Sequence, residues 1–150
     1  MGLCATAIPA SVCSAVCWED EAETAVENAF ADIPDDTWYT DAVIWASENG
    51  IVNGVAEGQF DPNANVTREQ LAAMMYRYAD FLGMDTAASG GLSRFHDGSQ
   101  VSSWASDAMK WAVGNGLISG KSSTILDPKG NATRAEVATI LQRMTALMVK

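Results

Sequence analysis

Two arginines in this sequence occupy positions at which an anion could be bound. Each directly follows a threonine, in Thr67-Arg68-Glu69-Gln70 and in Thr133-Arg134-Ala135-Glu136. A threonine with Gln or Glu three residues later is typical of a capped helix start, so each arginine is expected at the first helical position. Backbone amides are unpaired there, and a guanidinium beside them can hold a carboxylate through two parallel hydrogen bonds. A structural alternative stays open, in which Arg68 pairs with Asp61 and Arg134 with Asp127.

Three further pairs of residues are candidates for contact with a ligand. Indole rings can stack on the flat face of a ligand, a glycine admits close approach of a ligand to the backbone, and a carboxylate accepts hydrogen bonds from hydroxyl groups. The candidates are Trp38 and Trp104, Gly54 and Gly120, and Asp32 and Asp97. Each pair also has a structural interpretation: helix packing for the tryptophans, turn formation for the glycines, and a turn or cap for the aspartates.

All but one of these pairs share a single spacing, because the chain repeats itself at an offset of 66 residues. Trp38, Gly54 and Arg68 recur as Trp104, Gly120 and Arg134, whereas Asp32 and Asp97 differ by 65. An offset that runs through loops and apolar positions alike indicates one supersecondary unit used twice.

Each copy is predicted to be a helix, a loop and a second helix. The first helix begins near Trp38 or Trp104, and apolar residues at positions i, i+4, i+7 and i+8 form one face of it. That spacing favours core packing for Trp45 and Trp111. A glycine follows each helix, Gly50 in one copy and Gly116 in the other, and can close the last turn in a left-handed conformation.

The second helix of each copy carries an apolar stripe behind its capping box. The stripe comprises Leu71, Met74, Met75, Tyr78 and Leu82 in the first copy and Val137, Ile140, Leu141, Met144 and Met148 in the second. The fold class predicted from these patterns is all-α.

Composition excludes several classes of function. The formal net charge is −10, so the basic surface that nucleic acid requires is absent, and an anionic ligand must be held by a few locally placed arginines. No uncharged apolar stretch reaches the roughly 18 residues of a membrane span. No Ser/His/Asp set, fixed carboxylate pair or metal cluster is apparent, so neither an enzyme nor a cofactor is predicted.

The amino-terminal region differs from the repeats. Residues 1–17 carry no charge and hold all three cysteines (Cys4, Cys13 and Cys17), in a spacing that fits zinc poorly. We interpret them as a leader-like or irregular segment, and residues 18–29 as a short helix, a remnant of a preceding repeat. The domains expected after them are repeat 1 (30–82), a linker (83–94) that is flexible from its Gly, Ser and Ala content, and repeat 2 (95–150).

Loop residues 61–65 begin like a calcium loop, with oxygen donors at alternate positions. The pattern then requires glycine where Val66 lies and a glutamate where Ala72 lies, and the second copy has Lys129 in a ligand position. No metal site is predicted.

With these motifs in order, the chain resembles the S-layer homology (SLH) family of bacterial surface-anchoring modules. The resemblance rests on Phe-x-Asp, Trp…Ala…Trp-Ala, Asn-Gly-Ile/Leu, Phe/Leu-Asp-Pro and Thr-Arg-Glu/Ala-Gln/Glu, each present twice. It implies tandem helix-loop-helix repeats in a pseudo-threefold spindle, which two copies leave incomplete. It also implies an extracellular location at the bacterial cell wall and a non-catalytic role in binding secondary cell-wall polymer, often a pyruvylated glycan. On this resemblance, the arginine, tryptophan, glycine and aspartate pairs named above are the expected carbohydrate-binding residues.

The two-repeat length leaves alternatives open. A missing third repeat would leave apolar surface uncovered, so the chain could be a protein-interaction module that forms a homodimer or takes a third repeat from another chain. It could also be the anchoring end of a larger surface enzyme.

Overall fold

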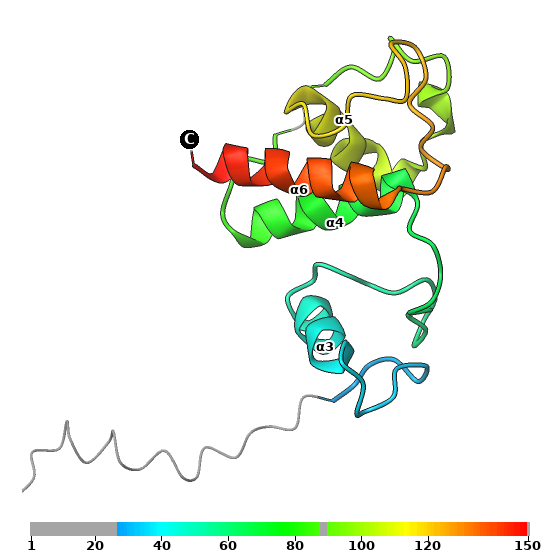
Figure 1. Cartoon of the computed structure of the whole chain (residues 1–150), viewed down its shortest axis with the longest axis vertical. Helices are drawn as coiled ribbons and strands as arrows, with labels where there is room; N and C mark the ends of the chain where they lie inside the picture. The colour runs from blue at the N-terminus through cyan, green and yellow to red at the C-terminus, as the bar shows by residue number, and fades with distance from the viewer. Residues whose placement is uncertain (1–26, 88–89, 150) are drawn as a thin grey trace, which may run out of the picture.

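A computed structural model describes residues 27–87 and 90–149 of the chain. This part contains four α-helices: α3 (Thr40–Glu48), α4 (Arg68–Phe81), α5 (Ser106–Gly114) and α6 (Arg134–Met148). Two short 3₁₀ helices, η1 (Gly98–Gln100) and η2 (Ser103–Ala105), precede α5, and the only β pairing among the described residues is two isolated bridges. The all-α prediction is therefore confirmed (Figure 1). The segments expected at 1–17 and in most of 18–29 lie outside the described residues.

Both second helices begin at the predicted capping boxes. In α4, the Gln70 backbone N–H donates to Thr67 Oγ1 (3.3 Å), and the Thr67 N–H donates to Gln70 Oε1 (2.9 Å). Thr133 and Glu136 make the same exchange at α6. Each box satisfies two backbone donors that the helix itself cannot pair, and its threonine contributes about 1 kcal/mol to stability. Arg68 and Arg134 are therefore the first helical residues, as predicted.

The first helices begin two residues later than the sequence pattern predicts. Helix α3 starts at Thr40 rather than at Trp38, and α5 starts at Ser106 after the 3₁₀ turn that contains Trp104. The predicted ends are confirmed: Gly50 and Gly116 have φ of 68° and 72°. After α3, the Ile51 N–H donates to the Ala46 carbonyl (2.8 Å), which closes the last turn.

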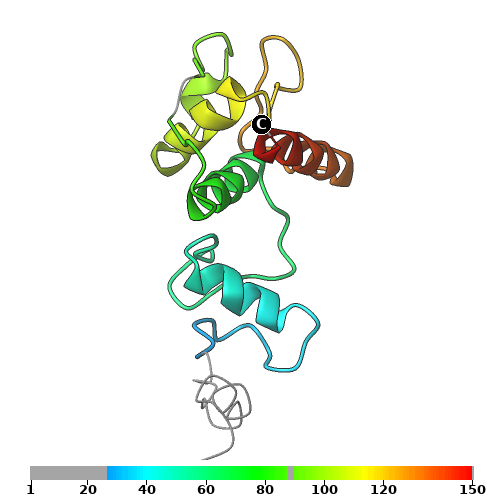
Figure 2. The ribbon, with the colours of Figure 1, turned by 90° about the vertical axis from the view of Figure 1, so that its left-hand side faces the viewer.

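The main core joins α4 of repeat 1 to repeat 2: Leu71, Ala72 and Ala79 of α4 are buried together with residues of the second repeat. Helix α4 of repeat 1 packs along α5 of repeat 2, and Figures 1 and 2 show α4, α5 and α6 as one group with α3 apart from it. Trp111 of α5 is 1% exposed. Its ring meets Tyr76 of α4 edge to face at 5.7 Å, and its Nε1 donates to the Asp85 carbonyl (3.2 Å). Two residues of the expected linker contact α5: Asp85 through its carbonyl, and Gly90, whose N–H donates to the Lys110 carbonyl (3.0 Å).

Helix α3 lacks the neighbour that α5 has. Trp45, the counterpart of Trp111, is 47% exposed. Core packing was predicted for both indoles and is confirmed for Trp111. It is wrong for Trp45: its ring meets that of Phe81 edge to face at 5.7 Å, but no described helix covers α3 as α4 covers α5, so the indole stays half exposed. The region around α3 has its own small cluster, formed by Phe30, Ile33 and Val43.

The predicted apolar stripes need a similar correction. The most buried residues of α4 are alanines at positions 72 and 79, which allow α5 to approach closely, and Leu82 is exposed. On α6, Ile140 and Met144 are buried, whereas Leu141 and Met148 are exposed because no helix lies against that face in the described part of the chain. The helical period identifies the apolar face of a helix, but it does not predict whether another helix packs against that face.

The Phe-x-Asp and glycine motifs build a frame for each loop. Asp97 accepts hydrogen bonds from the backbone N–H groups of Leu126 (2.8 Å) and Asp127 (2.6 Å), and Asp32 binds the corresponding groups of Phe60 and Asp61. Asp61 and Asp127, whose backbone N–H groups donate two of these bonds, adopt left-handed φ values of 56° and 53°, a conformation open to aspartate at modest cost. The contacts of Asp32 and Asp97 therefore agree with the structural interpretation, in which each aspartate stabilises a turn.

Gly120 is required by this frame. Its φ is 88°, and a Cβ there would lie 2.7 Å from the Ile125 carbonyl oxygen and 2.8 Å from the Phe95 ring. We expect Gly120→Ala to lower the free energy of unfolding by more than about 2 kcal/mol. Gly116→Ala is the matched control, because Gly116 shares the positive φ but has nothing within 4 Å of a Cβ. Equal losses for the two variants in urea denaturation would contradict this account.

Candidate functional site

The two arginines at the helix starts lie in different environments. Arg68 is 5% exposed; its Nε donates to the Leu126 carbonyl (3.0 Å), and its guanidinium forms an ion pair with Glu136. The Thr133 N–H chiefly, and then the charge of Arg68, hold the pKa of Glu136 below its ordinary value, while burial opposes them. Arg68 thus pairs with a carboxylate of repeat 2 rather than with Asp61.

Arg134 is exposed, and within the described residues its side chain has no ion pair or hydrogen bond meeting standard distances. Arg134 differs from Arg68 because both partners of Arg68, Leu126 and Glu136, belong to the repeat that follows it. No described repeat follows α6, so the same residue type at the same helical position stays in solvent.

Glu69 forms a second link between the repeats. Its carboxylate is 3% exposed and accepts hydrogen bonds from the backbone N–H of Ser102 (3.0 Å), the Ser102 hydroxyl (2.9 Å) and Lys129 Nζ (2.8 Å). Burial raises the pKa of Glu69, but the hydrogen bonds from Lys129 and Ser102 outweigh it, and the pKa lies below its ordinary value. Backbone bonds from the Arg68 and Glu69 N–H groups to Gly130 and Pro128 complete the junction.

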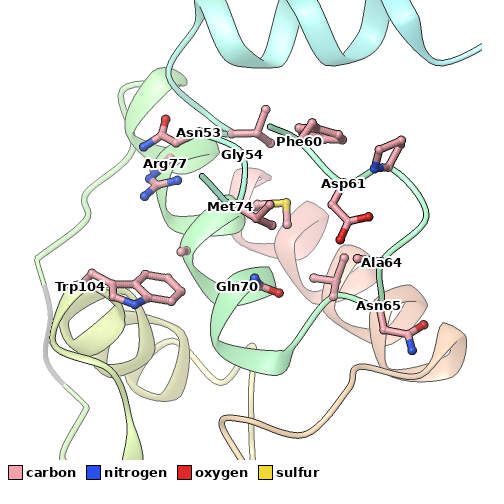
Figure 3. A pocket seen from close by; sticks show the side chains of 15 residues that line it. Asn53, Gly54, Phe60, Asp61, Ala64, Asn65, Gln70, Met74, Arg77 and Trp104 are labelled. Carbon is pink, nitrogen blue, oxygen red and sulfur yellow. The ribbon is translucent and has the colours of Figure 1, made fainter. Parts of the chain in front are cut away.

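A groove of about 440 Å³, called the first groove here, lies between the loop of repeat 1, helix α4 and the start of repeat 2. Its lining comprises residues 52–55, 60–62 and 64–66 of the loop, Gln70, Ala73, Met74 and Arg77 of α4, and Trp104. In Figure 3, Arg77, Asn53 and Trp104 lie on one side of the groove, Asp61 and Asn65 lie on the other, and Met74 lies between them. The groove therefore has a cationic and aromatic end and an acidic and amide end.

Arg77 is held in place at one nitrogen. Its Nη1 lies 3.5 Å from the carbonyl oxygen of Ile51, at the closed end of α3. The guanidinium has five N–H donors, so donors remain for a bound anion. The indole of Trp104 is 55% exposed, so it presents an accessible surface in the same groove. A planar cation next to an exposed ring suits a sugar that carries a carboxylate.

A smaller groove of about 200 Å³, the second groove, occupies the corresponding place in repeat 2. Residues 117–120, Ala135, Glu136, Thr139, Ile140 and Arg143 line it together with Arg68. Arg143 Nη1 donates to the Leu117 carbonyl (3.0 Å), as Arg77 does to Ile51. The second groove differs in having a carboxylate, Glu136, where the first has Gln70, and its lining includes no tryptophan.

The residues selected from the sequence separate into three groups. Trp104 and Gly54 line the first groove, and Arg68 and Gly120 line the second. The other four line neither of these two grooves: Trp38, Arg134, Asp32 and Asp97. Whether any of the eight contacts a glycan stays a prediction.

The groove arginines, Arg77 and Arg143, were absent from the sequence-based candidates. They differ by 66 positions, the offset that identified the repeats, and each lies within a predicted helix. Pairing every charged residue at that offset would have found them. The helix-start arginines drew attention first because a capped start is recognisable locally, whereas a groove wall depends on the loop that folds over it.

Comparison with known proteins identifies two copies of one domain in the chain. The family model of the S-layer homology domain matches residues 29–72 and 94–138. The chain belongs to the S-layer homology family. Domains of this family are non-catalytic modules that anchor surface proteins, including enzymes and S-layer proteins, to the cell wall.

Three relatives illustrate the range of proteins that carry such modules. The chain is 37% identical over 117 residues to the surface-layer 125 kDa protein of Lysinibacillus sphaericus and 33% identical over 119 residues to exoglucanase XynX of Acetivibrio thermocellus. It is 25% identical over 114 residues to the cellulosome-anchoring protein of A. thermocellus. These matches cover 76%, 79% and 76% of this chain but only 10%, 11% and 25% of the relatives.

Two properties of the described residues bear on other classes of site. No helix among them is both long and apolar enough to cross a membrane. Residues 27–87 and 90–149 also contain no group of three or more His, Cys, Asp or Glu side chains arranged to hold a metal ion.

The junction at Glu69 predicts acid sensitivity. Because the folded-state pKa of Glu69 lies below its ordinary value of 4.5, its contribution to stability is present above that value and is lost as the pH falls through the folded-state pKa. We expect Glu69→Gln to lower the free energy of unfolding near neutral pH by about 1–3 kcal/mol, and the difference from wild type to shrink at acid pH. Urea denaturation as a function of pH measures it. Glu48→Gln, on the exposed side of α3, is the control, and a pH-independent deficit for Glu69→Gln would refute the assignment.

Proposed function

We propose that this chain is a cell-wall anchoring module that binds an anionic secondary cell-wall polysaccharide, of the pyruvylated class, in the first groove. The observation that carries the proposal is the meeting of Arg77, Trp104 and the loop of repeat 1 around one groove. Its volume of about 440 Å³ falls within the roughly 300–1,000 Å³ typical of ligand sites.

The chemistry assigns a role to each end of the groove. Arg77 binds the carboxylate of the glycan, and Trp104 stacks on the adjoining sugar face. Asn53 and Gln70 supply amide groups that both donate to and accept from sugar hydroxyls. Asp61 accepts hydroxyl bonds at the far end and repels a second anionic group there, so the glycan lies in one direction.

The net charge of the chain strengthens the case for a local cation. A protein of formal net charge −10 repels polyanions at long range, so the binding energy for an anionic glycan has to come from short, directional contacts. The family's anchoring role and the names of its relatives, among them a surface-layer protein and a cellulosome-anchoring protein, support the cell wall as the place of binding. The match to a small part of an exoglucanase supports the further proposal that such a module ends a larger surface protein.

The helix-start arginines are a second locus for the same ligand. Arg134 is exposed beside the free amides of α6, which is the geometry proposed from the sequence. Arg68 already binds Glu136, so a ligand carboxylate there would have to displace that ion pair. The first groove is favoured because it also offers a ring and amide groups.

We expect Arg77→Ala to weaken binding to pyruvylated wall polymer about tenfold or more at dilute protein, because a charge-assisted pair is lost. Arg143→Ala is the matched control, since it removes the corresponding bond to a loop carbonyl in the smaller groove. Co-sedimentation with purified wall sacculi measures binding, and thermal unfolding verifies that both variants fold. Equal affinity of Arg77→Ala and wild type would overturn the assignment of the groove.

A second comparison separates the two loci and tests the ligand class. Arg134→Ala should leave the affinity unchanged if the first groove binds the glycan, and should abolish co-sedimentation if the helix start does. Arg68→Ala combined with Arg134→Ala then reports on the helix-start pair together. Removal of pyruvate from the sacculi should reduce wild-type binding to the level of Arg77→Ala; undiminished binding would show that the ligand is not the pyruvylated group.

A further inference from the structure

The second groove is an unfinished copy of the first. In the first groove, loop and helix residues of repeat 1 form most of the lining, and Trp104 of the following repeat completes it beside Arg77. The second groove has the counterparts Gly120 and Arg143 but no indole. The counterpart of Trp104 in repeat 1 is Trp38, which is 94% exposed and lines neither groove.

The helix next to the second groove has an open face. On α4, Ala72 and Ala79 are 1% and 0% exposed because α5 covers them. Their counterparts on α6, Ala138 and Thr145, are exposed, and Leu141 between them is 51% exposed. This face of α6 therefore has the residue positions of the α5-binding face of α4 without a helix against it in the described part of the chain.

The helix that carries the matching face is open as well. Ala108 and Trp111 of α5 are 4% and 1% exposed where they lie against α4. Their counterparts on α3, Ala42 and Trp45, are both exposed. One chain thus presents two open faces: the face of α6 corresponds to that of α4, and the face of α3 corresponds to that of α5.

We propose that copies of this chain associate head to tail, with α3 of one copy docked on α6 of another in the way that α5 docks on α4. Trp38 of the docked copy then forms the missing wall of the second groove, which becomes a second glycan site. The role of that site rests on the proposed function; the association does not. We identify the partner as a second copy of this chain because α3 and α6 carry, at equivalent positions, the faces through which α5 and α4 already pack.

The proposed contact between two copies is weaker than the contact between repeat 1 and repeat 2 within one chain. Arg68 binds the carboxylate of Glu136, whereas Arg134 would meet the amide of Gln70 in the docked copy. Glu69, which binds Lys129 and Ser102, is replaced by Ala135. The association is therefore reversible and depends on concentration. Because the two faces differ, each added copy leaves one face of each kind open.

Sedimentation of two face variants and their mixture tests the association without any glycan. Ala42→Glu alters the α3 face and Leu141→Glu the α6 face, both at exposed positions, and Trp45 is left in place because its ring packs against Phe81 of the same chain. We expect wild type to self-associate, each variant alone to associate about tenfold or more weakly, and the equimolar mixture to form dimers through the one intact pair of faces. A wild type that stays monomeric at high concentration, or a mixture that behaves as its separate components, would overturn the proposal.

A variant designed to strengthen the association tests the docking geometry independently. Gln70→Glu supplies the carboxylate that Arg134 lacks while keeping the capping box, so it should tighten the association severalfold. The same change with Arg134→Ala should lose that gain. Tightening that does not depend on Arg134 would argue against the docking geometry.

Glycan stoichiometry then tests the completed groove. At protein concentrations that favour association, calorimetry with soluble wall polymer should detect a second site that Trp38→Ala or Arg143→Ala removes. Association without a second site would limit the proposal to docking. Absence of binding at both grooves would instead refute the proposed function and leave the sedimentation result intact.

Discussion

The structure depends on the junction at which the start of α4 is enclosed by repeat 2. Arg68 and Glu69 are adjacent, oppositely charged and almost fully buried, and each finds its partners in the other repeat. A buried charge without a partner is strongly destabilising, so this pair makes the relative position of the repeats specific rather than merely favourable. The capped start of α4 brings both side chains to the junction at once.

This junction explains why equivalent residues of the two repeats behave differently. Trp111 is enclosed by Tyr76 of the preceding repeat and Asp85 of the segment between the repeats. Trp45 meets the Phe81 ring of its own repeat and has no neighbour from a preceding repeat among the described residues. Arg68 is enclosed by the following repeat, whereas Arg134 is not. Burial in this fold is a property of the interface between repeats, as expected of units that cannot bury their apolar faces alone.

The loops contribute rigidity where the grooves need a wall. Asp97 and its counterpart Asp32 each bind two successive backbone N–H groups, and a phenylalanine ring fills the space beside Gly54 or Gly120. A loop framed in this way can present backbone and side chains to a ligand without first being ordered, which lowers the entropic cost of binding. The same motifs that identify the family thus support the groove, while Arg77 and Trp104 at its surface are available for contact.

Sequence alone determined the local structure of this protein. The capping boxes and the helix-ending glycines depend on residues a few positions apart, and together with the 66-residue offset they were enough to predict the all-α class and the family. Tertiary structure alone decided which of two equivalent side chains is buried, that Arg68 binds Glu136, and that Arg77 and Trp104, from different repeats, share one groove. These outcomes depend on which neighbour lies against each helix, and a helical period records an apolar face without recording what covers it.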